Sequence, residues 1–142
     1  MNQNVFEDLP PPQFPRRSLA GLKILLVEDD ALSREALELV LSAHGASVRS
    51  AESVSQALLL LEGEEPGMLI SDIGLPGVDG YELMRRIRAR EADEGGHLAA
   101  LAVSGFSDVS GGLARAAGFD GFLCKPVNID ALVARVRGLA NP

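Results

Sequence analysis

Short runs of apolar residues alternate along the chain with segments in which apolar residues recur every three or four positions. The runs predict strands that are buried on both faces, and the longer spacing predicts helices. Strands are expected at 22–27, 46–51, 68–72, 98–103 and 119–124. Helices are expected near 31–44, from Ser53 to before Pro66, near 79–91, near 107–117, and from Asn128 onward. Five strands that alternate with five helices predict an α/β fold, a doubly wound parallel sheet with right-handed crossovers.

The helical segments also suggest where helices begin and which faces are apolar. Ser53 and Asn128 are expected to cap the second and fifth helices, and Asp30 to supply favourable negative charge at the start of the first. The face expected to be apolar in the first helix comprises Leu32, Ala36, Leu39 and Val40; residues Val54, Ala57, Leu58 and Leu61 are expected to point inward from the second.

The first twenty residues differ from the rest, because four prolines stand there among polar and charged residues. We expect residues 1–20 to be a linker or tail and residues 21–140 to form one domain. No apolar run approaches the ~20 residues of a membrane span, and no secretory signal is visible. The net charge of −7 argues against nonspecific binding of nucleic acid. The single cysteine, Cys124, excludes an internal disulfide and is expected to be buried; the cytoplasm is the expected compartment.

Polar residues follow four of the predicted strands at their carboxyl ends. Glu28 and Asp29 follow the first, Asp72 ends the third, Ser104 follows the fourth, and Lys125 follows the fifth. In an open parallel sheet these ends share one edge, where ligands bind. The fold should therefore gather these residues in one crevice.

Three carboxylates in one crevice need a cation or must take up protons. Oxygen ligands without His or Cys favour Mg2+ over zinc. A metal-bound Asp72 could attack a phosphoryl group to give an aspartyl phosphate. Lys125 and Ser104 could then stabilise the phosphoryl oxygens with a positive charge and a hydroxyl donor.

Four motifs in this order resemble the receiver domain of bacterial two-component response regulators. They are Ile-Leu-Leu-Val-Glu-Asp-Asp, Ser-Asp-Ile-Gly-Leu-Pro-Gly-Val-Asp-Gly, Ala-Val-Ser-Gly-Phe and Gly-Phe-Leu-Cys-Lys-Pro-Val, within about 21–140. The resemblance implies a flavodoxin-like strand order of 2-1-3-4-5. It also implies that the domain catalyses its own phosphotransfer and dephosphorylation without being a conventional enzyme.

The resemblance assigns a role to each site residue. Asp72 matches the phosphoacceptor, with Lys125 as the lysine that pairs with the phosphate. The Mg2+ ligands would be Asp29 directly, Glu28 through water, Asp72, and the carbonyl of Gly74. Ser104 and Phe122 match the switch hydroxyl and the switch aromatic residue, although Phe122 lacks the hydroxyl of the more common tyrosine. Gly74 and Gly105 stand where larger side chains often occur, which predicts an acyl phosphate open to water.

The implied partners are a histidine kinase or histidine phosphotransfer protein upstream and a protein that binds the face of the fourth helix, fifth strand and fifth helix downstream. No contact with nucleic acid or membrane is expected. The Pro-rich start fits either a stand-alone receiver or the C-terminal receiver of a hybrid histidine kinase. The alternatives are a small Mg2+-dependent phosphohydrolase on the same fold, disfavoured because no Asp stands two residues after Asp72, and a receiver that only scaffolds, disfavoured by the intact acidic set.

Overall fold

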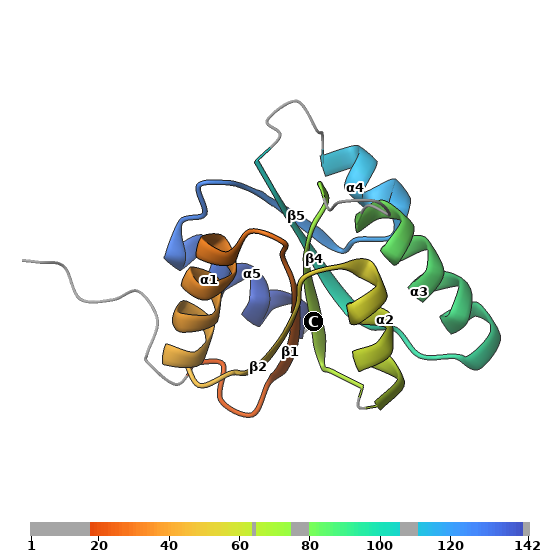
Figure 1. Cartoon of the computed structure of the whole chain (residues 1–142), viewed down its shortest axis with the longest axis horizontal. Coiled ribbons are helices and arrows are strands. Elements are labelled where there is room, and N and C mark those ends of the chain that lie inside the picture. Colours follow the sequence, from red (N-terminus) through yellow and green to blue (C-terminus); the bar gives the residue numbers. More distant parts are fainter. Residues whose placement is uncertain (1–17, 64, 75–79, 106–110, 141–142) are drawn as a thin grey trace, which may run out of the picture.

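Five parallel strands form one sheet at the centre of the molecule. The structure, a computed structural model, describes residues 18–63, 65–74, 80–105 and 111–140. The strands are β1 (Lys23–Val27), β2 (Ser47–Ala51), β3 (Met68–Asp72), β4 (Ala99–Ser104) and β5 (Gly121–Cys124), in the order β2-β1-β3-β4-β5 (Figure 1). All four strand pairs are parallel, which confirms the predicted flavodoxin-like α/β fold.

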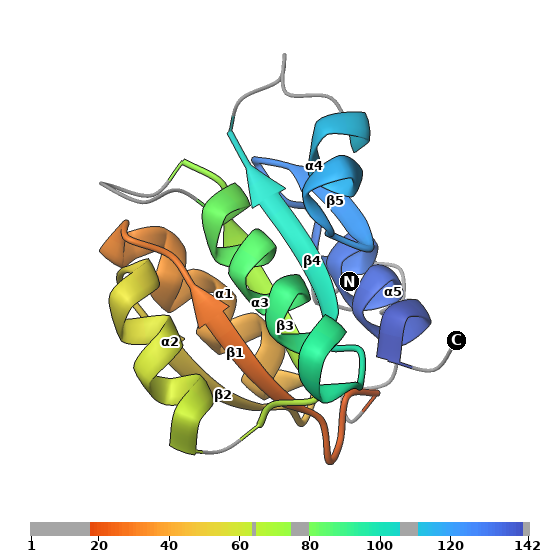
Figure 2. The same ribbon diagram turned by 90° about the vertical axis from the view of Figure 1, so that its right-hand side faces the viewer.

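Helices cover both faces of the sheet. They are α1 (Ala31–Ala43), α2 (Val54–Gly63), α3 (Gly80–Glu94), α4 (Gly111–Ala117) and α5 (Ile129–Ala140). Helices α1 and α5 lie on one face, and α2, α3 and α4 lie on the other (Figures 1 and 2). Each face has its own apolar cluster, so the strands are buried from both sides, as their continuous apolar runs require.

Local side-chain contacts fix where three of the helices begin. The carboxylate of Asp30 accepts a hydrogen bond from the Ser33 backbone N–H at 2.9 Å. The Ser53 hydroxyl accepts one from Gln56 at 3.2 Å, and the Asn128 side chain accepts one from Ala131 at 3.0 Å. Each contact satisfies a backbone donor that the first helical turn leaves without a partner. The predicted capping roles of Ser53 and Asn128 are confirmed.

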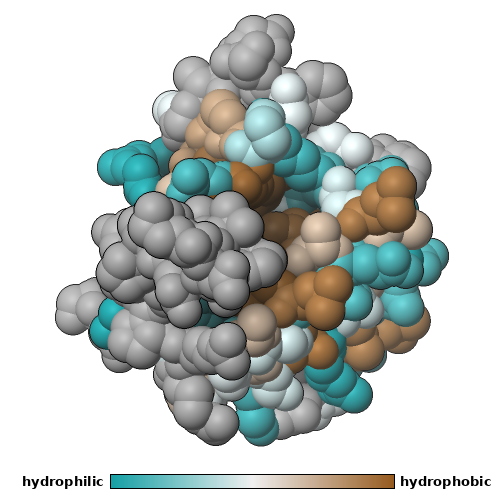
Figure 3. Space-filling view, turned by 90° about the vertical axis from the view of Figure 1, so that its left-hand side faces the viewer, coloured by the Kyte–Doolittle hydropathy of each residue, from teal (hydrophilic) through white to brown (hydrophobic). Residues whose placement is uncertain are grey.

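Only part of the predicted apolar face of α1 packs on the sheet: Val40 does, whereas Leu32, Ala36 and Leu39 are exposed. Leu32 and Leu39 are 78% and 73% exposed, whereas Leu41 is fully buried and Leu37 packs against the same cluster. The helix carries two apolar stripes, and periodicity alone does not decide between them. Docking on the sheet selects the stripe of Leu37 and Leu41, four residues apart. Figure 3 views this side of the molecule, where brown and teal atoms are interspersed.

Two further expectations need correction. Cys124 is exposed, because β5 is an edge strand and its last residue has no cover. Helix α3 continues to Glu94, beyond the expected end near 91, and ends before two glycines with positive φ, Gly95 and Gly96. Leu19, in the segment expected to be a linker or tail, is 3% exposed and lies in the core.

Candidate functional site

The register of the sheet brings the ends of four strands level with one another. Val27 pairs with Ser71, Asp72 with Val103, and Ser104 with Cys124. The residues that follow these positions therefore meet at one edge, although they come from distant parts of the sequence. The predicted crevice at the carboxyl ends of the strands exists, and it brings Glu28, Asp29, Asp72 and Lys125 together.

Lys125 links two of the carboxylates. Its Nζ donates a hydrogen bond to Oδ2 of Asp72 at 3.1 Å and another to Oε1 of Glu28. The Glu28 side chain is 1% exposed and that of Asp72 13% exposed. A buried carboxylate is stable only when it is paired, protonated or bound to a metal, and the ammonium group supplies one such pairing for two carboxylates.

A third carboxylate completes an acidic cluster. One oxygen each from Glu28, Asp29 and Asp72 lies within 4.8 Å of the others, and Asp29 is exposed on the solvent side. Oε2 of Glu28 is buried and has no hydrogen-bond partner among the described residues. Converging oxygen ligands with one side open to water are the donor set that suits Mg2+, which keeps several water ligands. The residues present therefore fit a magnesium ion.

The same arrangement separates the pKa values of the carboxylates. Burial, together with the neighbouring Asp72, raises the pKa of Glu28 to about 7 despite the opposing effect of Lys125. Burial also raises the pKa of Asp72, but its interactions with Glu28 and Lys125 outweigh this, and the net pKa is lowered. Burial lowers the pKa of Lys125, whereas its hydrogen bonds to Glu28 and Asp72 raise it, with a net increase. Asp72 thus remains ionised near neutral pH, beside an ammonium group that stays charged.

Comparison with known proteins now decides the family. A family model described as the response regulator receiver domain matches residues 24–137. The chain belongs to this family. The match spans every strand except the first residue of β1, and it includes the whole acidic cluster.

Individual proteins agree with this assignment. The transcriptional regulatory protein AfsQ1 of Streptomyces coelicolor is 39% identical over 116 residues, which are 82% of this chain and 50% of AfsQ1. A crystal structure assigned as a response regulator of Chloroflexus aurantiacus is 35% identical, with a TM-score of 0.79 over 85% of this chain and 98% of that one. The receiver domain of Ssk1 from Saccharomyces cerevisiae, crystallised with the histidine phosphotransfer protein Ypd1, is 23% identical; its TM-score of 0.77 over 84% of this chain and 88% of that one shows the shared fold.

The remaining predicted positions of the receiver site lie around Asp72. The Gly74 backbone N–H donates to Oδ1 of Asp72 at 3.1 Å, while ligation by the Gly74 carbonyl stays a prediction. Ser104 is fully buried as the last residue of β4. Gly105 is exposed, and a Cβ there would meet no described atom within 4 Å. The described residues therefore leave open space beside Gly105.

Phe122 lies on β5 beside a cavity. The side chain is half-buried and packs against the cluster under α2, α3 and α4. A cavity of about 290 Å³ lies against it, lined also by Gly112 and Arg115 of α4 and Arg135 of α5. The predicted switch residue thus borders free volume next to the fourth helix, which is the space that a change of rotamer needs.

One residue at this site was not predicted from the sequence. Arg34 of α1 places its guanidinium against the backbone carbonyls of Glu28 and Asp29. An arginine within a helix has no sequence signal for such a role, because most helical arginines are solvated. Only the folded loop shows what Arg34 contacts.

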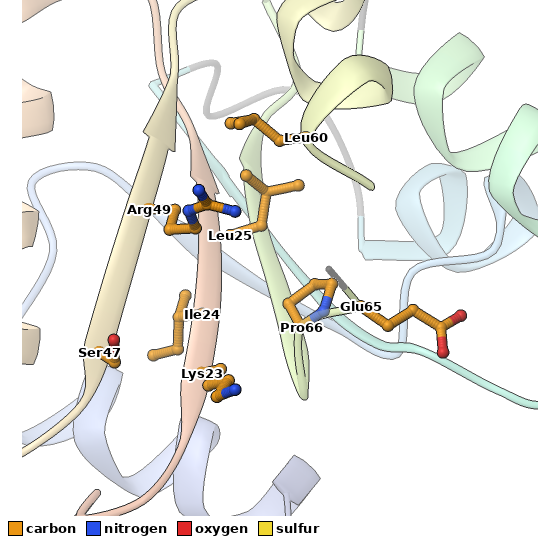
Figure 4. Close-up of a pocket in the computed structure, with 8 residues that line it drawn as sticks. All are labelled: Lys23, Ile24, Leu25, Ser47, Arg49, Leu60, Glu65 and Pro66. Atoms are coloured by element: carbon orange, nitrogen blue, oxygen red, sulfur yellow. The ribbon is translucent and has the colours of Figure 1, made fainter. Parts of the chain in front are cut away.

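A pocket at the opposite end of the sheet is separate from the receiver site. It has a volume of about 310 Å³ and is lined by the side chains of Lys23, Leu25, Arg49, Leu60 and Pro66, among others (Figure 4). Lys23 begins β1, whereas the acidic cluster follows its end.

Among the described helices, none is long and apolar enough to cross a membrane.

Proposed function

We propose that this receiver domain accepts a phosphoryl group on Asp72 with the help of Mg2+ and thereby switches the binding of a partner. The observation that carries the proposal is the position of the Asp72 carboxylate. It lies between the Lys125 ammonium group, at 3.1 Å, and the oxygens of Glu28 and Asp29, within 4.8 Å. A nucleophile, a cation and two further metal ligands are the parts that phosphoryl transfer requires.

In the proposed transfer, a carboxylate oxygen of Asp72 attacks the phosphorus of a phosphohistidine on the donor protein. A bond between oxygen and phosphorus forms, the bond between phosphorus and nitrogen breaks, and the electron pair of that bond leaves with the imidazole. Asp29, Asp72 and the Gly74 carbonyl would hold Mg2+ directly and Glu28 would hold it through water; the ion would neutralise charge on the phosphoryl oxygens. Lys125, already within hydrogen-bond distance of Asp72, would shift its contact to one of these oxygens.

The low pKa of Asp72 supports its role as a nucleophile, because the carboxylate is ionised at neutral pH without a separate base. Glu28 would serve in metal binding instead, although burial raises its pKa. Its proton would leave when the cation arrives, so binding of Mg2+ would release a proton near neutral pH.

Phosphorylation would then be read at the face formed by α4, β5 and α5. Ser104 would turn its hydroxyl toward a phosphoryl oxygen, and Phe122 would move within the cavity beside α4. The phosphoryl group shifts the population between two states only through contacts that differ between them, and the Ser104 hydroxyl supplies one such contact. The partner would bind the remodelled face.

A histidine phosphotransfer protein or histidine kinase is the proposed upstream partner. The Ssk1 receiver domain, which shares this fold, forms a crystalline complex with the phosphotransfer protein Ypd1. The chain spans about half the length of AfsQ1, so the activity and output of a whole protein are also part of the proposal. Three expectations stay predictions. They are a cytoplasmic location, a domain boundary at residue 20, and the origin of the chain as a stand-alone receiver or as the receiver of a hybrid histidine kinase. The family match favours a receiver over the phosphohydrolase considered above.

The proposal is tested by phosphorylation in vitro. The whole chain is incubated with Mg2+ and a small phosphoramidate, and the protein-bound phosphoryl group is measured by intact-mass spectrometry. Wild type is compared with Asp72→Asn and with Asp93→Asn, a change of the same kind at an exposed position of α3. We expect label on wild type and on Asp93→Asn and none on Asp72→Asn. Absence of label from wild type, or equal labelling of the Asp72 variant, would contradict the proposal.

A further inference from the structure

Arg34 lies in the first turns of α1, yet its side chain is only 15% exposed. One guanidinium nitrogen, Nη1, donates to the carbonyl oxygen of Glu28 at 3.1 Å and approaches that of Asp29 at 3.5 Å. These two residues place carboxylates in the acidic cluster beside that of Asp72. The arginine therefore contacts the backbone of the acidic pair rather than its side chains.

The other end of the guanidinium is held by a second loop. Nη2 of Arg34 lies 3.3 Å from a carboxylate oxygen of Glu52, in the connection between β2 and α2. Next to it, the Glu28 backbone N–H donates to the carbonyl of Ala51 at 3.0 Å. One planar group thus bridges the segment after β1 to the segment after β2. A lysine cannot do the same, since its ammonium group is a single point without the fixed fork of donors.

We propose that Arg34 is a positioning residue for the acidic pair. By fixing the peptide groups of Glu28 and Asp29 it would aim their carboxylates at the point where they converge with Asp72 on a divalent cation. This inference rests on the proposed function, and it specifies how the metal side of that site is held in place. Arg34 bonds to the backbone of the acidic pair and to Glu52, so it would act on a cation only through the acidic pair.

Charge and geometry predict opposite effects of removing this side chain. A guanidinium close to a cation site repels a divalent cation, so loss of its charge alone would tighten binding of Mg2+. Loss of a group that orients metal ligands weakens metal binding, typically by about 10- to 100-fold. The direction of the change in affinity therefore separates positioning from simple electrostatics.

The test measures Mg2+ affinity of the whole chain by isothermal titration calorimetry, without any phosphodonor. The variants are Arg34→Ala, Arg34→Lys and, as a matched control, Arg85→Ala. Arg85 is also helical and pairs with a glutamate, Glu82, but it lies on the exposed surface of α3. We expect about tenfold weaker binding for Arg34→Ala, a smaller loss for Arg34→Lys, and no change for Arg85→Ala.

A second measurement uses the protein without metal. Amide hydrogen exchange at Glu28 and Ser33, whose N–H groups bond to Ala51 and Asp30, is compared between wild type and Arg34→Ala. Faster exchange at these amides, with unchanged exchange in the core of β4, is expected from a loosened loop. The β4 amides also show that the variant is folded.

Three results would overturn the inference. They are unchanged or tighter Mg2+ binding by Arg34→Ala, wild-type binding by Arg34→Lys, and unchanged exchange at Glu28 and Ser33 in Arg34→Ala. If wild type itself binds no Mg2+, the proposed function fails, and the exchange comparison still decides whether Arg34 holds the loop.

Discussion

The two sides of the Asp72 site differ in how many side chains surround it. On the metal side, Glu28 and Asp29 are held by side chains, because Lys125 bonds to Glu28 and Arg34 bonds to the backbone of both. On the other side, the described residues next to Asp72 and Ser104 include Gly74 and Gly105, which have no side chains. The proposed metal ligands Glu28 and Asp29 would thus be held in place before a cation binds, whereas a phosphoryl group would have little cover.

This difference affects the transfer of a phosphoryl group to Asp72 and its later hydrolysis in different ways. Fixed oxygens and a paired ammonium group lower the cost of reorganisation during transfer. Protection from water depends on atoms that surround the product, and no described atom lies within 4 Å of a Cβ built at Gly105. The contrast predicts a receiver that is loaded readily and loses its phosphoryl group readily.

The largest expected effect comes from Lys125→Ala. The lysine is the described cation that bonds to Asp72, and removal of one preorganised donor to a developing oxyanion costs about 100-fold in rate. We expect phosphorylation by a small donor to slow by about this factor, measured as the initial rate of labelling. Lys23→Ala, at the opposite end of β1, is the control and should keep the wild-type rate. Equal rates for both variants would show that the metal side does not need its ammonium group.

The next effect is on stability as a function of pH, without metal. The pKa of Glu28 is about 7 in the folded protein and 4.5 when unfolded, so the folded state binds more protons between these values. Stability from this group is full below pH 4.5 and falls as the pH rises, by on the order of 2 kcal/mol between pH 5 and pH 7. The lowered pKa of Asp72 changes stability only at more acidic pH, and the raised pKa of Lys125 changes it only at alkaline pH.

Urea unfolding of wild type and Glu28→Gln at several pH values measures this contribution. The difference in unfolding free energy between them should change with pH between 5 and 7, because the amide does not titrate. Glu35→Gln, on the exposed side of α1, should run parallel to wild type. Parallel curves for Glu28→Gln would mean that the carboxylate is not a buried proton acceptor.

The glycine side is tested by Gly105→Met. A long, flexible side chain at this open position should cover the acyl phosphate and exclude water. We expect loss of label to slow by about tenfold, or ~1.4 kcal/mol in activation free energy. The control is Gly63→Met, at an equally open position in α2. The contrast between the two sides is wrong if wild type already keeps its label for as long as the Gly105 variant does.

The smallest effect distinguishes two neighbouring carboxylates on the metal side. Asp30 caps α1, so Asp30→Ala should lower the unfolding free energy slightly. The same variant should leave Mg2+ affinity near the wild-type value, because Asp30 is outside the acidic cluster. Asp29→Ala should weaken Mg2+ binding and leave the unfolding free energy near the wild-type value. Calorimetric titration with Mg2+ and urea unfolding of both variants would measure these two effects. Strong loss of Mg2+ affinity in Asp30→Ala would show that Asp30 belongs to the metal site.

Much of this site could be predicted from the sequence because parallel topology fixes which strand ends meet. Once 68–72 and 98–103 are recognised as strands, Asp72 and Ser104 must lie on one edge. The packed face of α1 could not be predicted, since Leu32 and Leu41 are equally apolar and only docking on the sheet distinguishes them. Arg34 could not be predicted either, because its partners are backbone carbonyls, which every sequence has.

The most direct test of the central claim is binding of beryllofluoride, a mimic of the acyl phosphate, in the presence of Mg2+. Amide NMR spectra of wild type and Asp72→Asn are recorded during titration of the whole chain. The account predicts a stoichiometric complex for wild type, with shifts at Asp72, at Ser104 and along β5, and no complex for Asp72→Asn. Absence of a complex in wild type, or identical shifts in the variant, would contradict it.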